Sequence, residues 1–181
     1  MLADSFGRIV TDLRASLTDR CNLRCSYCMP PEGLDWLPSP ALLTDGELAG
    51  LIGIAVQQLG IAEVRFTGGE PLLRRGLPGI VARTAALRPR PQISLTTNGI
   101  GLARLAGPLR EAGLDRLNVS LDTLSSETFA TLARRNRLPD VLAGLSAAAA
   151  AGLTPVKVEP AISLPQVRPP AQIGRSGPVD V

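Results

Sequence analysis

Short apolar runs alternate with longer helical patterns along most of this chain. The apolar runs predict strands, which we expect at Leu13–Leu17, Glu63–Phe66, Ile93–Leu95, Leu117–Leu121 and Pro155–Val158. The segments between them predict helices, which we expect at Thr44–Leu59, Arg75–Leu87, Gly101–Ala112, Ser125–Arg134 and Pro139–Ala151. Thr44 and Glu47 have the spacing of a capping box at the start of the first helix.

This alternation of strand and helix predicts an α/β fold built on a parallel sheet. Right-handed crossovers join such strands, and five strands are fewer than the eight of a closed barrel, so we expect an incomplete (βα) barrel. From residue 159 onward, prolines and glycines replace the periodic pattern, which is typical of a disordered or irregular segment. We therefore expect one domain over residues 1–158 and a proline-rich tail over 159–181.

Composition narrows the class of protein. Hydrophobic residues make up 45% of the chain and aromatic residues 3%, which suits buried parallel strands covered by alanine-rich helices. The net charge is +3 with scattered basic residues, which disfavours a nucleic-acid surface and is compatible with a small anionic substrate. We expect neither a membrane span, which needs about 20 apolar residues, nor a signal peptide. The expected location is a reducing cytoplasm.

The three cysteines lie together as Cys21, Cys25 and Cys28, and the chain has no histidine. A structural zinc site needs a fourth cysteine or histidine, and a disulfide would leave one thiol over. Thiolates also favour iron-sulfur clusters, in which one iron can take a ligand from outside the protein. The spacing therefore indicates a 4Fe-4S cluster with one open iron; unlinked or structurally paired cysteines are the alternative. The adjacent Arg20 and Arg24 are expected to lower the thiol pKa values.

Polar residues follow the predicted strands, at the ends where ligands gather in folds of this type. Gly68-Gly69-Glu70-Pro71 could be a ligand cradle, because glycine lets the backbone approach a bound molecule, or a tight strand-to-helix turn. Thr96 and Ser120 could each contact a ligand or be a hydrogen-bonded hydroxyl within the sheet. Asn98-Gly99 is typical of a turn.

Three cations, Arg14, Arg65 and Lys157, lie on or beside three different predicted strands. An isolated Arg or Lys is usually a hydrated surface charge. Arg65 and Lys157 stand among apolar residues, so each needs an anionic partner or an open pocket, and a triphosphate would be such a partner. Other arginines are expected to lie on the surface, among them Arg74, Arg75, Arg134 and Arg135.

The cluster loop of the radical S-adenosylmethionine (radical SAM) superfamily is similar to Thr18-Asp19-Arg20-Cys21-Asn22-Leu23-Arg24-Cys25 and Tyr27-Cys28-Met29-Pro30. With Asp12-Leu13-Arg14 added, the chain resembles one family within it, the GTP 3',8-cyclases of molybdenum cofactor biosynthesis. The resemblance extends as far as Lys157-Val158. It implies a lyase that converts GTP into (8S)-3',8-cyclo-7,8-dihydroguanosine 5'-triphosphate by means of a 5'-deoxyadenosyl radical.

The resemblance also implies roles for individual residues. Cys21, Cys25 and Cys28 match the ligands of the 4Fe-4S cluster. The residues that match contacts to SAM are Tyr27, Gly69 and Ser120, and those that match contacts to GTP are Arg14, Arg65, Thr96 and Lys157. The implied partners are an electron donor and the next enzyme of molybdopterin synthesis. No side chain has to act as a general base, and the oligomeric state is left open.

The chain departs from the cyclase family in its last part. That family continues to three further cysteines and an arginine cluster that bind a second cluster and GTP, which this sequence lacks. Glu159 stands where the family has asparagine, and Pro178-Val179-Asp180-Val181 stands where it has a double-glycine terminus. We therefore expect a truncated or frameshifted form with impaired or no cyclase activity. The alternatives are a non-catalytic remnant with an uncovered strand edge and a radical SAM enzyme with another substrate.

Overall fold

The computed structural model describes residues 2–160. It begins with an antiparallel hairpin of β1 (Leu2–Ala3) and β2 (Ile9–Val10), which the hydrophobic pattern does not predict. The longer strands are β3 (Asp12–Ser16), β4 (Glu63–Thr67), β5 (Gln92–Thr97), β6 (Arg116–Ser120) and β7 (Val156–Glu159). The helices are α1 (Asp45–Leu59), α2 (Leu77–Ala85), α3 (Leu102–Glu111), α4 (Ser126–Ala133) and α5 (Leu138–Ala150), with 3-10 turns η1 (Ser39–Ala41) and η2 (Pro71–Leu73). Strand β7 includes Glu159, the first residue of the predicted tail, and Pro160 follows it. Residues 161–181 of the predicted tail lie outside the described residues.

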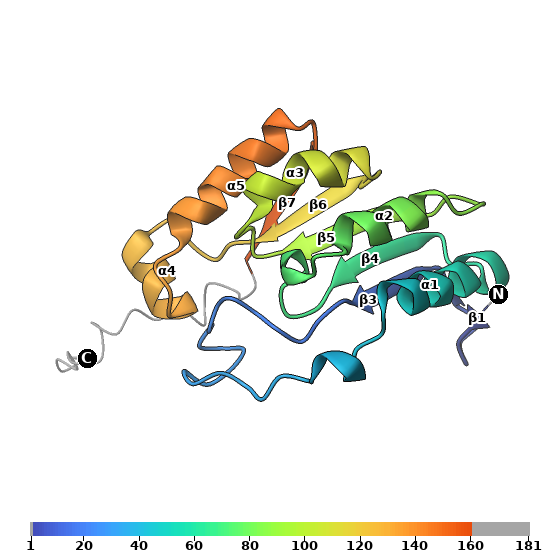
Figure 1. The fold of residues 1–181 in the computed structure, drawn as a ribbon, viewed down its shortest axis with the longest axis horizontal. Coiled ribbons are helices and arrows are strands. Elements are labelled where there is room, and N and C mark those ends of the chain that lie inside the picture. Colours follow the sequence, from blue (N-terminus) through green and yellow to red (C-terminus); the bar gives the residue numbers. More distant parts are fainter. Residues whose placement is uncertain (1, 161–181) are drawn as a thin grey trace, which may run out of the picture.

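Strands β3 to β7 form one parallel sheet in the order of the chain. Because right-handed crossovers add each new strand at the same edge, the connecting helices all come to lie on one face of the sheet. Figure 1 shows α1, α2, α3 and α5 on that face. Among the described strands, β3 pairs only with β4 and β7 only with β6, so the sheet stays open. The prediction of an incomplete, parallel (βα) barrel is confirmed.

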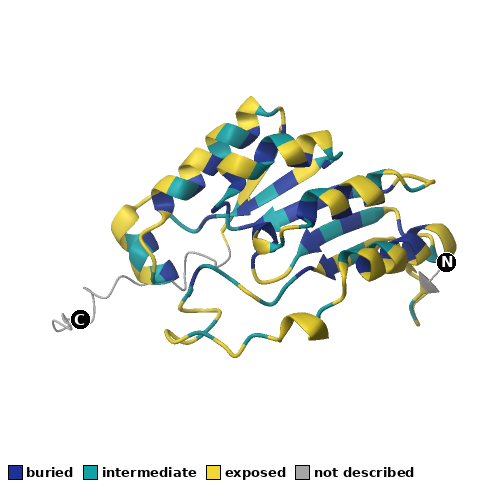
Figure 2. Cartoon of the chain, in the orientation of Figure 1, coloured by how far each residue is buried: buried dark blue, intermediate teal, exposed yellow. Residues whose placement is uncertain are grey.

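Alternate residues of each strand face opposite sides of the sheet. Val64, Phe66, Leu95 and Val119 face the helices and are 0% exposed, and Figure 2 shows buried positions alternating with accessible ones along the strands. The residues that alternate with these helix-facing positions lie on the side that α1, α2, α3 and α5 do not cover, which we call the inner face. Its side chains include Arg14, Arg65, Thr67, Ser94, Thr96, Arg116, Asn118, Ser120 and Lys157. The strands therefore present a hydrophobic face to the helices and a polar one to the inner side.

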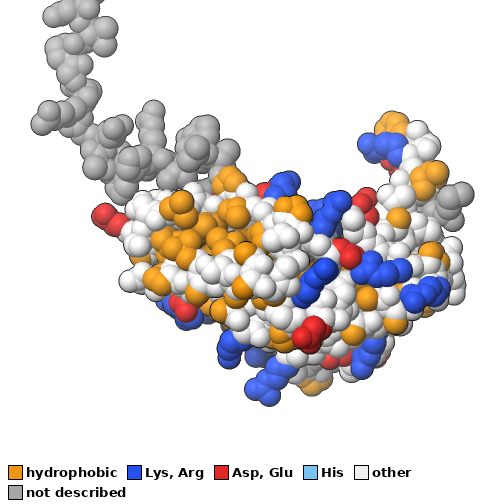
Figure 3. Space-filling model, turned by 90° about the horizontal axis from the view of Figure 1, so that it is seen from above, with side chains coloured by type: hydrophobic (Ala, Val, Ile, Leu, Met, Phe, Trp, Pro, Cys, Tyr) orange, Lys and Arg blue, Asp and Glu red, His pale blue; other side chains and the backbone are white. Residues whose placement is uncertain are grey.

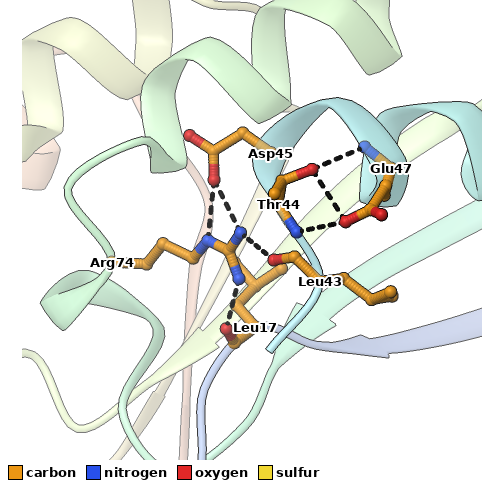
Figure 4. Close-up of polar contacts among 6 residues, drawn as sticks. All are labelled: Leu17, Leu43, Thr44, Asp45, Glu47 and Arg74. Atoms are coloured by element: carbon orange, nitrogen blue, oxygen red, sulfur yellow. Dashed lines mark hydrogen bonds and ion pairs between the residues drawn. The ribbon is translucent and has the colours of Figure 1, made fainter. Parts of the chain in front are cut away.

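Helix α1 begins with the predicted capping box (Figure 4). The hydroxyl of Thr44 accepts a hydrogen bond from the backbone N–H of Glu47 at 3.2 Å. The Glu47 carboxylate accepts one from the backbone N–H of Thr44 at 2.8 Å. These bonds hold the pKa of the Glu47 carboxyl below its usual value. The start of α1 is therefore set by local hydrogen bonds that the sequence predicts.

Arg74, expected on the surface, links three segments beside that helix start (Figure 4). Its guanidinium forms an ion pair with Asp45 at 2.6 Å and donates to the carbonyl oxygens of Leu17 at 2.8 Å and Leu43 at 2.6 Å. Its side chain is 14% exposed. The surface prediction is wrong for Arg74 because the fold brings together carbonyl groups that are far apart in the sequence.

One segment, Ser39–Leu59, is long and apolar enough to cross a membrane by length and composition alone, although we expected no such stretch. It comprises η1, a short connection and α1. Leu48, Ile52 and Val56 of α1 belong to the hydrophobic core. In this structure the segment thus contributes to the helical layer that covers the sheet.

The surface carries mixed charge. Figure 3 shows Lys and Arg side chains scattered over one face of the molecule, with Asp and Glu among them and a group of hydrophobic side chains nearby. Two exposed ion pairs illustrate the mixing: Arg90 with Asp115 at 2.8 Å and Arg137 with Asp140 at 2.5 Å. On the face shown, basic side chains are interspersed with acidic ones.

Candidate functional site

A segment that we call the cysteine loop, residues 18–30, follows β3 and borders a cavity of about 210 Å³. Residues from the carboxyl ends of β4, β5 and β6 line the same cavity. The predicted site residues that meet there are Cys21, Cys25, Tyr27, Cys28, Gly69, Thr96 and Ser120. We call it the cysteine cavity. The structure therefore brings together all predicted cluster and SAM residues, together with one of the four predicted GTP residues.

The cysteine loop is fastened to the end of helix α4. The backbone N–H groups of Arg24 and Ser26 donate to the carbonyl oxygens of Ala133 and Leu132, at 3.0 and 2.8 Å. The Arg134 guanidinium donates to the carbonyl oxygens of Arg24 at 3.3 Å and Met29 at 2.9 Å. Arg134, expected to lie on the surface, is therefore a partly buried donor that holds the loop, and nothing local in the sequence signals this contact.

The turn at Gly68 and Gly69 packs directly against the backbone of the cysteine loop. The N–H of Gly69 donates to the carbonyl oxygen of Thr18 at 2.7 Å. A Cβ atom at either glycine would overlap backbone carbonyl oxygens of the loop, that of Thr18 for Gly68 and that of Arg20 for Gly69. Gly68 also has φ +139°, a conformation that favours glycine. The tight-turn interpretation is therefore correct, and because both glycines line the cysteine cavity, it does not compete with a ligand contact.

Glu70 is a buried carboxylate that the sequence interpretation did not single out. Its side chain is 0% exposed and accepts hydrogen bonds from Thr97 Oγ1 at 2.7 Å, Asn98 N at 2.7 Å and Leu72 N at 2.9 Å. Burial raises the pKa of the Glu70 carboxyl, while the three donors act in the opposite direction. The sequence signal that could have indicated this buried carboxylate is a charged residue directly after two glycines in a turn.

Asn98, predicted to belong to a simple turn, connects this carboxylate to the cysteine loop. Its side-chain amide donates to the Asn22 side chain at 2.8 Å and approaches Cys21 Sγ at 3.9 Å. Its side-chain oxygen accepts from the backbone N–H of Ile100 at 3.0 Å, as in a turn. The turn prediction was correct but incomplete, since the same residue also orients the loop around the first cysteine.

The surroundings of the three thiols raise their pKa values and so favour the protonated form. Cys21 and Cys25 are half-buried and Cys28 is exposed. Burial raises the pKa of all three thiols, that of Cys25 to about 11. Arg24 lowers the pKa of Cys21, but burial has the larger effect and raises it. The Arg24 guanidinium donates to the carbonyl oxygens of Cys21 and Leu23 and lies 5.5 Å from the centroid of the Trp36 ring. The expectation that the arginines lower the thiol pKa values is thus confirmed for Arg24 acting on Cys21, but the pKa of each thiol is raised in total because burial is the largest cause.

Tyr27 joins the cysteine loop to the end of β6. Its hydroxyl donates to the Asp122 carboxylate at 2.6 Å. Burial and this bond raise the pKa of the Tyr27 phenol, so it stays a protonated donor. Asp122, which also lines the cysteine cavity, is a second acidic residue to which the sequence interpretation gave no role.

The other predicted GTP residues lie further toward the amino ends of the strands. Arg65 and Lys157 border a second hollow of about 530 Å³, also lined by Glu63, Ser94, Arg116, Leu117, Asn118, Pro155 and Val156. We call it the cationic hollow. Arg14 is exposed and pairs in register with Arg65, and Lys157 forms an ion pair with Glu159 at 2.5 Å. Arg65 thus faces an open hollow, whereas Lys157 has an acidic partner of its own.

The three cysteines fit a cluster better than a single ion. In the described part of the chain, no set of three His, Cys, Asp or Glu side chains is gathered closely enough to hold one metal ion. A 4Fe-4S cluster needs thiolates that are further apart, since each binds a different iron. Three cysteines that border one cavity together with Gly68 and Gly69 agree with this arrangement.

The chain is similar to proteins of known family. The family model for the radical SAM superfamily matches residues 15–162. A GTP 3',8-cyclase of Streptomyces coelicolor is 70% identical over 158 residues, which cover 87% of this chain and 46% of that protein. GTP 3',8-cyclase 2 of Mycobacterium tuberculosis is 68% identical over 157 residues, covering 87% and 44%. The chain therefore spans less than half the length of these relatives.

Solved structures share the fold at low sequence identity. HydG, a maturase of the FeFe-hydrogenase, superposes with a TM-score of 0.64 at 12% identity, covering 81% of this chain and 34% of that one. The structure of anSMEcpe with bound AdoMet and the Cp18Cys peptide gives a TM-score of 0.63 at 18% identity, covering 81% and 41%. At these identities the likeness shows the fold alone.

Proposed function

Because the chain belongs to the radical SAM superfamily, we propose that Cys21, Cys25 and Cys28 hold one 4Fe-4S cluster and that SAM binds in the cysteine cavity. The family uses this cluster together with SAM. When bound, the reduced cluster supplies the electron that cleaves the carbon-sulfur bond of SAM. The observation that supports the proposal most directly is that all three cysteines border one cavity with the ends of three strands.

Residues around the cavity supply contacts for SAM. The N–H of Gly69 donates to Thr18, and the Gly69 carbonyl oxygen accepts no hydrogen bond from another described residue. Gly69 therefore offers this carbonyl oxygen to the methionyl ammonium group. Ser120 offers a hydroxyl from the last position of β6. Tyr27 offers backbone groups, since its phenol is engaged with Asp122.

The proposed substrate is GTP, and the proposed reaction is that of a GTP 3',8-cyclase in molybdenum cofactor biosynthesis. Relatives with that name are 66 to 70% identical to this chain. Thr96 lies at the cysteine cavity, where the sugar must meet the radical, while Arg65 and Lys157 border the cationic hollow and Arg14 flanks Arg65. Thr96 and Lys157 both flank Asn118 in the sheet, so cavity and hollow adjoin on one face.

The chain's own residues would position reactants and exclude water rather than move protons. The loop contacts from Arg134 and Asn98 keep the cysteines in place, and Phe129 and Leu23 form apolar walls of the cavity. The pathway partners of this proposal are an electron donor and the next enzyme of molybdopterin synthesis, in a reducing cytoplasm.

The test is anaerobic reconstitution of the 181-residue chain with iron and sulfide, followed by incubation with SAM, a reductant and GTP. We expect about one cluster per chain by absorption and iron content, and 5'-deoxyadenosine on reduction. The triple variant with serine at Cys21, Cys25 and Cys28 should show neither. Bound zinc, or no iron-sulfur absorption, would contradict the cluster assignment.

The substrate is tested separately in the same experiment. For a GTP cyclase, 5'-deoxyadenosine formation rises when GTP is added and not when ATP is added. Mass spectrometry then shows whether this chain alone forms the cyclised product, for which we expect little or none. Equal 5'-deoxyadenosine yields with and without GTP would argue for a radical SAM enzyme with another substrate.

A further inference from the structure

A row of side chains crosses the inner face toward the amino ends of the strands. Backbone pairing places Arg14 opposite Arg65, Arg65 opposite Ser94, and Ser94 opposite Arg116. Neighbouring strands are about 4.8 Å apart, so Arg65 and Arg116 flank Ser94 on successive strands. We call Arg14, Arg65 and Arg116 the arginine row.

The guanidinium groups of the arginine row have no hydrogen-bonding or acidic partner among the residues that the structure describes. Within residues 2–160, none of its three guanidinium groups forms an ion pair or a hydrogen bond, whereas Arg74 and Arg90 pair with acids. Like charges placed directly opposite each other on a sheet are destabilising. Among residues 2–160, the row is therefore a line of unpaired positive charge on the face that α1, α2, α3 and α5 do not cover.

Two members of the row share the cationic hollow. Arg65 and Arg116 both line it, on either side of Ser94, which is 9% exposed. Glu63 is the acidic residue among the described lining residues; it pairs in register with Asp12 and Gln92 and forms no ion pair with the row. The guanidinium group presents a planar fork of donors that matches phosphate oxygens in pairs. An oligophosphate is therefore the anion that this hollow suits.

We infer that Arg116 binds phosphate oxygens of the nucleoside triphosphate substrate together with Arg65. The inference rests on the proposed function and adds a residue that the family resemblance does not assign. An isolated exposed arginine would simply be hydrated. Arg116 differs from such a residue because it shares both a register row and a hollow with Arg65.

The experiment measures equilibrium binding of GTP, guanosine and inorganic tripolyphosphate to the 181-residue chain. The variants are Arg116→Gln, Arg116→Lys and Arg65→Gln. Arg83→Gln, at an exposed position in the last turn of α2, removes the same charge from the helical layer and is the matched control. Far-UV circular dichroism and the unfolding midpoint verify that each variant is folded.

We expect Arg116→Gln and Arg65→Gln to weaken binding of GTP and tripolyphosphate about tenfold or more. The affinity of both variants for guanosine, and the affinity of Arg83→Gln for GTP and tripolyphosphate, should stay within about twofold of wild type. The affinity of Arg116→Lys for GTP should lie between those of wild type and Arg116→Gln, because lysine keeps the charge but lacks the planar fork of donors. The inference would be overturned if Arg116→Gln bound GTP as tightly as Arg83→Gln does. It would also be overturned if Arg116→Gln weakened the binding of guanosine as much as that of GTP.

A different set of binding results would show that GTP is not the substrate. If tripolyphosphate binding depends on Arg116 while GTP binds no better than ATP, the GTP assignment fails and the phosphate role of Arg116 stands. If wild type binds neither GTP nor tripolyphosphate, the inference is overturned. The yield of 5'-deoxyadenosine then still reports independently on the radical chemistry.

Discussion

The backbone N–H of Asn98 donates a 2.7 Å hydrogen bond to Oε2 of Glu70, a carboxylate with no exposed surface. This bond joins the turn after β4 to the end of β5. The Asn98 side chain then reaches Asn22 beside the first cysteine, at 2.8 Å. The position of Cys21 therefore depends on groups from three segments that are far apart in the sequence.

Replacing Glu70 with glutamine should destabilise the fold by about 1–3 kcal/mol. Glutamine keeps one acceptor oxygen but places an amide N–H2 group against one of the three donors that now meet the carboxylate. Urea unfolding followed by circular dichroism measures the change. Glu32→Gln, at an exposed loop position, is the control, and an equal midpoint for both variants would show that the buried bonds contribute nothing net.

Gly69→Ala should displace the cysteine loop, because the new Cβ would overlap the carbonyl oxygens of Asp19 and Arg20. We expect a loss of about 2 kcal/mol or more in unfolding free energy, together with poor retention of reconstituted iron. Gly79→Ala is the matched control: nothing lies within 4 Å of a Cβ there, and α2 should gain about 0.5–1 kcal/mol. Normal iron content in Gly69→Ala would disprove the close packing.

Arg134→Ala should release the cysteine loop without unfolding the domain. Two loop carbonyl groups, of Arg24 and Met29, lose their guanidinium donor. We expect the reconstituted protein to lose iron to a chelator several times faster than wild type. The neighbouring Arg135→Ala removes an exposed arginine whose side chain, among the described residues, hydrogen-bonds the Arg134 carbonyl oxygen alone, and it should lose iron at the wild-type rate. Equal rates for the two variants would rule out this role.

Thr44→Ala should lower the unfolding free energy by about 1 kcal/mol through loss of the helix cap. Thr128→Ala makes a fair comparison, since it removes a similar methyl and hydroxyl on α4 without removing that helix's cap residue, Ser125. Thermal unfolding would show the larger decrease for Thr44→Ala. A larger decrease in unfolding free energy for Thr128→Ala would mean that the α1 cap contributes little to stability.

The contribution of Glu47 should depend on pH. Its carboxyl pKa in the fold is below the ordinary value of 4.5 because it accepts hydrogen bonds from Thr44. A lowered folded pKa means that the charged carboxylate stabilises the fold above pH 4.5, and that this effect is lost as the pH falls through the folded pKa. The difference in unfolding midpoint between wild type and Glu47→Gln should therefore shrink from pH 7 to pH 4. A constant difference would contradict the linkage.

The sequence predicts the order and type of the main elements because apolar runs mark the strand residues that face the helices. Strand ends are less well predicted: Gln92 and Arg116 begin their strands although they are polar. Their backbones pair in the ladder while their side chains point to the inner face, so the apolar run begins one residue after the strand does. The hairpin at Leu2–Ala3 and Ile9–Val10 is too short to leave a periodic signal.

The cavity was partly predictable, because cysteine spacing and polar strand ends are local features. The partners that hold it were not. Arg74 and Arg134 are predicted to be surface charges, yet each donates to carbonyl groups brought near by the fold. The charge of a residue indicates its preferred surroundings, but the carbonyl groups that can satisfy it depend on tertiary structure. Burial likewise outweighs the lowering effect of Arg24 on the pKa of the Cys21 thiol.

Strand β4 separates two kinds of constraint within five residues. Val64 and Phe66 have no exposed surface, while Arg65 and Thr67 alternate with them and lie on the opposite side of the strand. A substitution scan along β4 should therefore show a period of two, with thermal stability and ligand affinity responding at alternate positions. Specificity could then diverge among relatives of this chain by changes on one side of each strand, with no compensating change in the core.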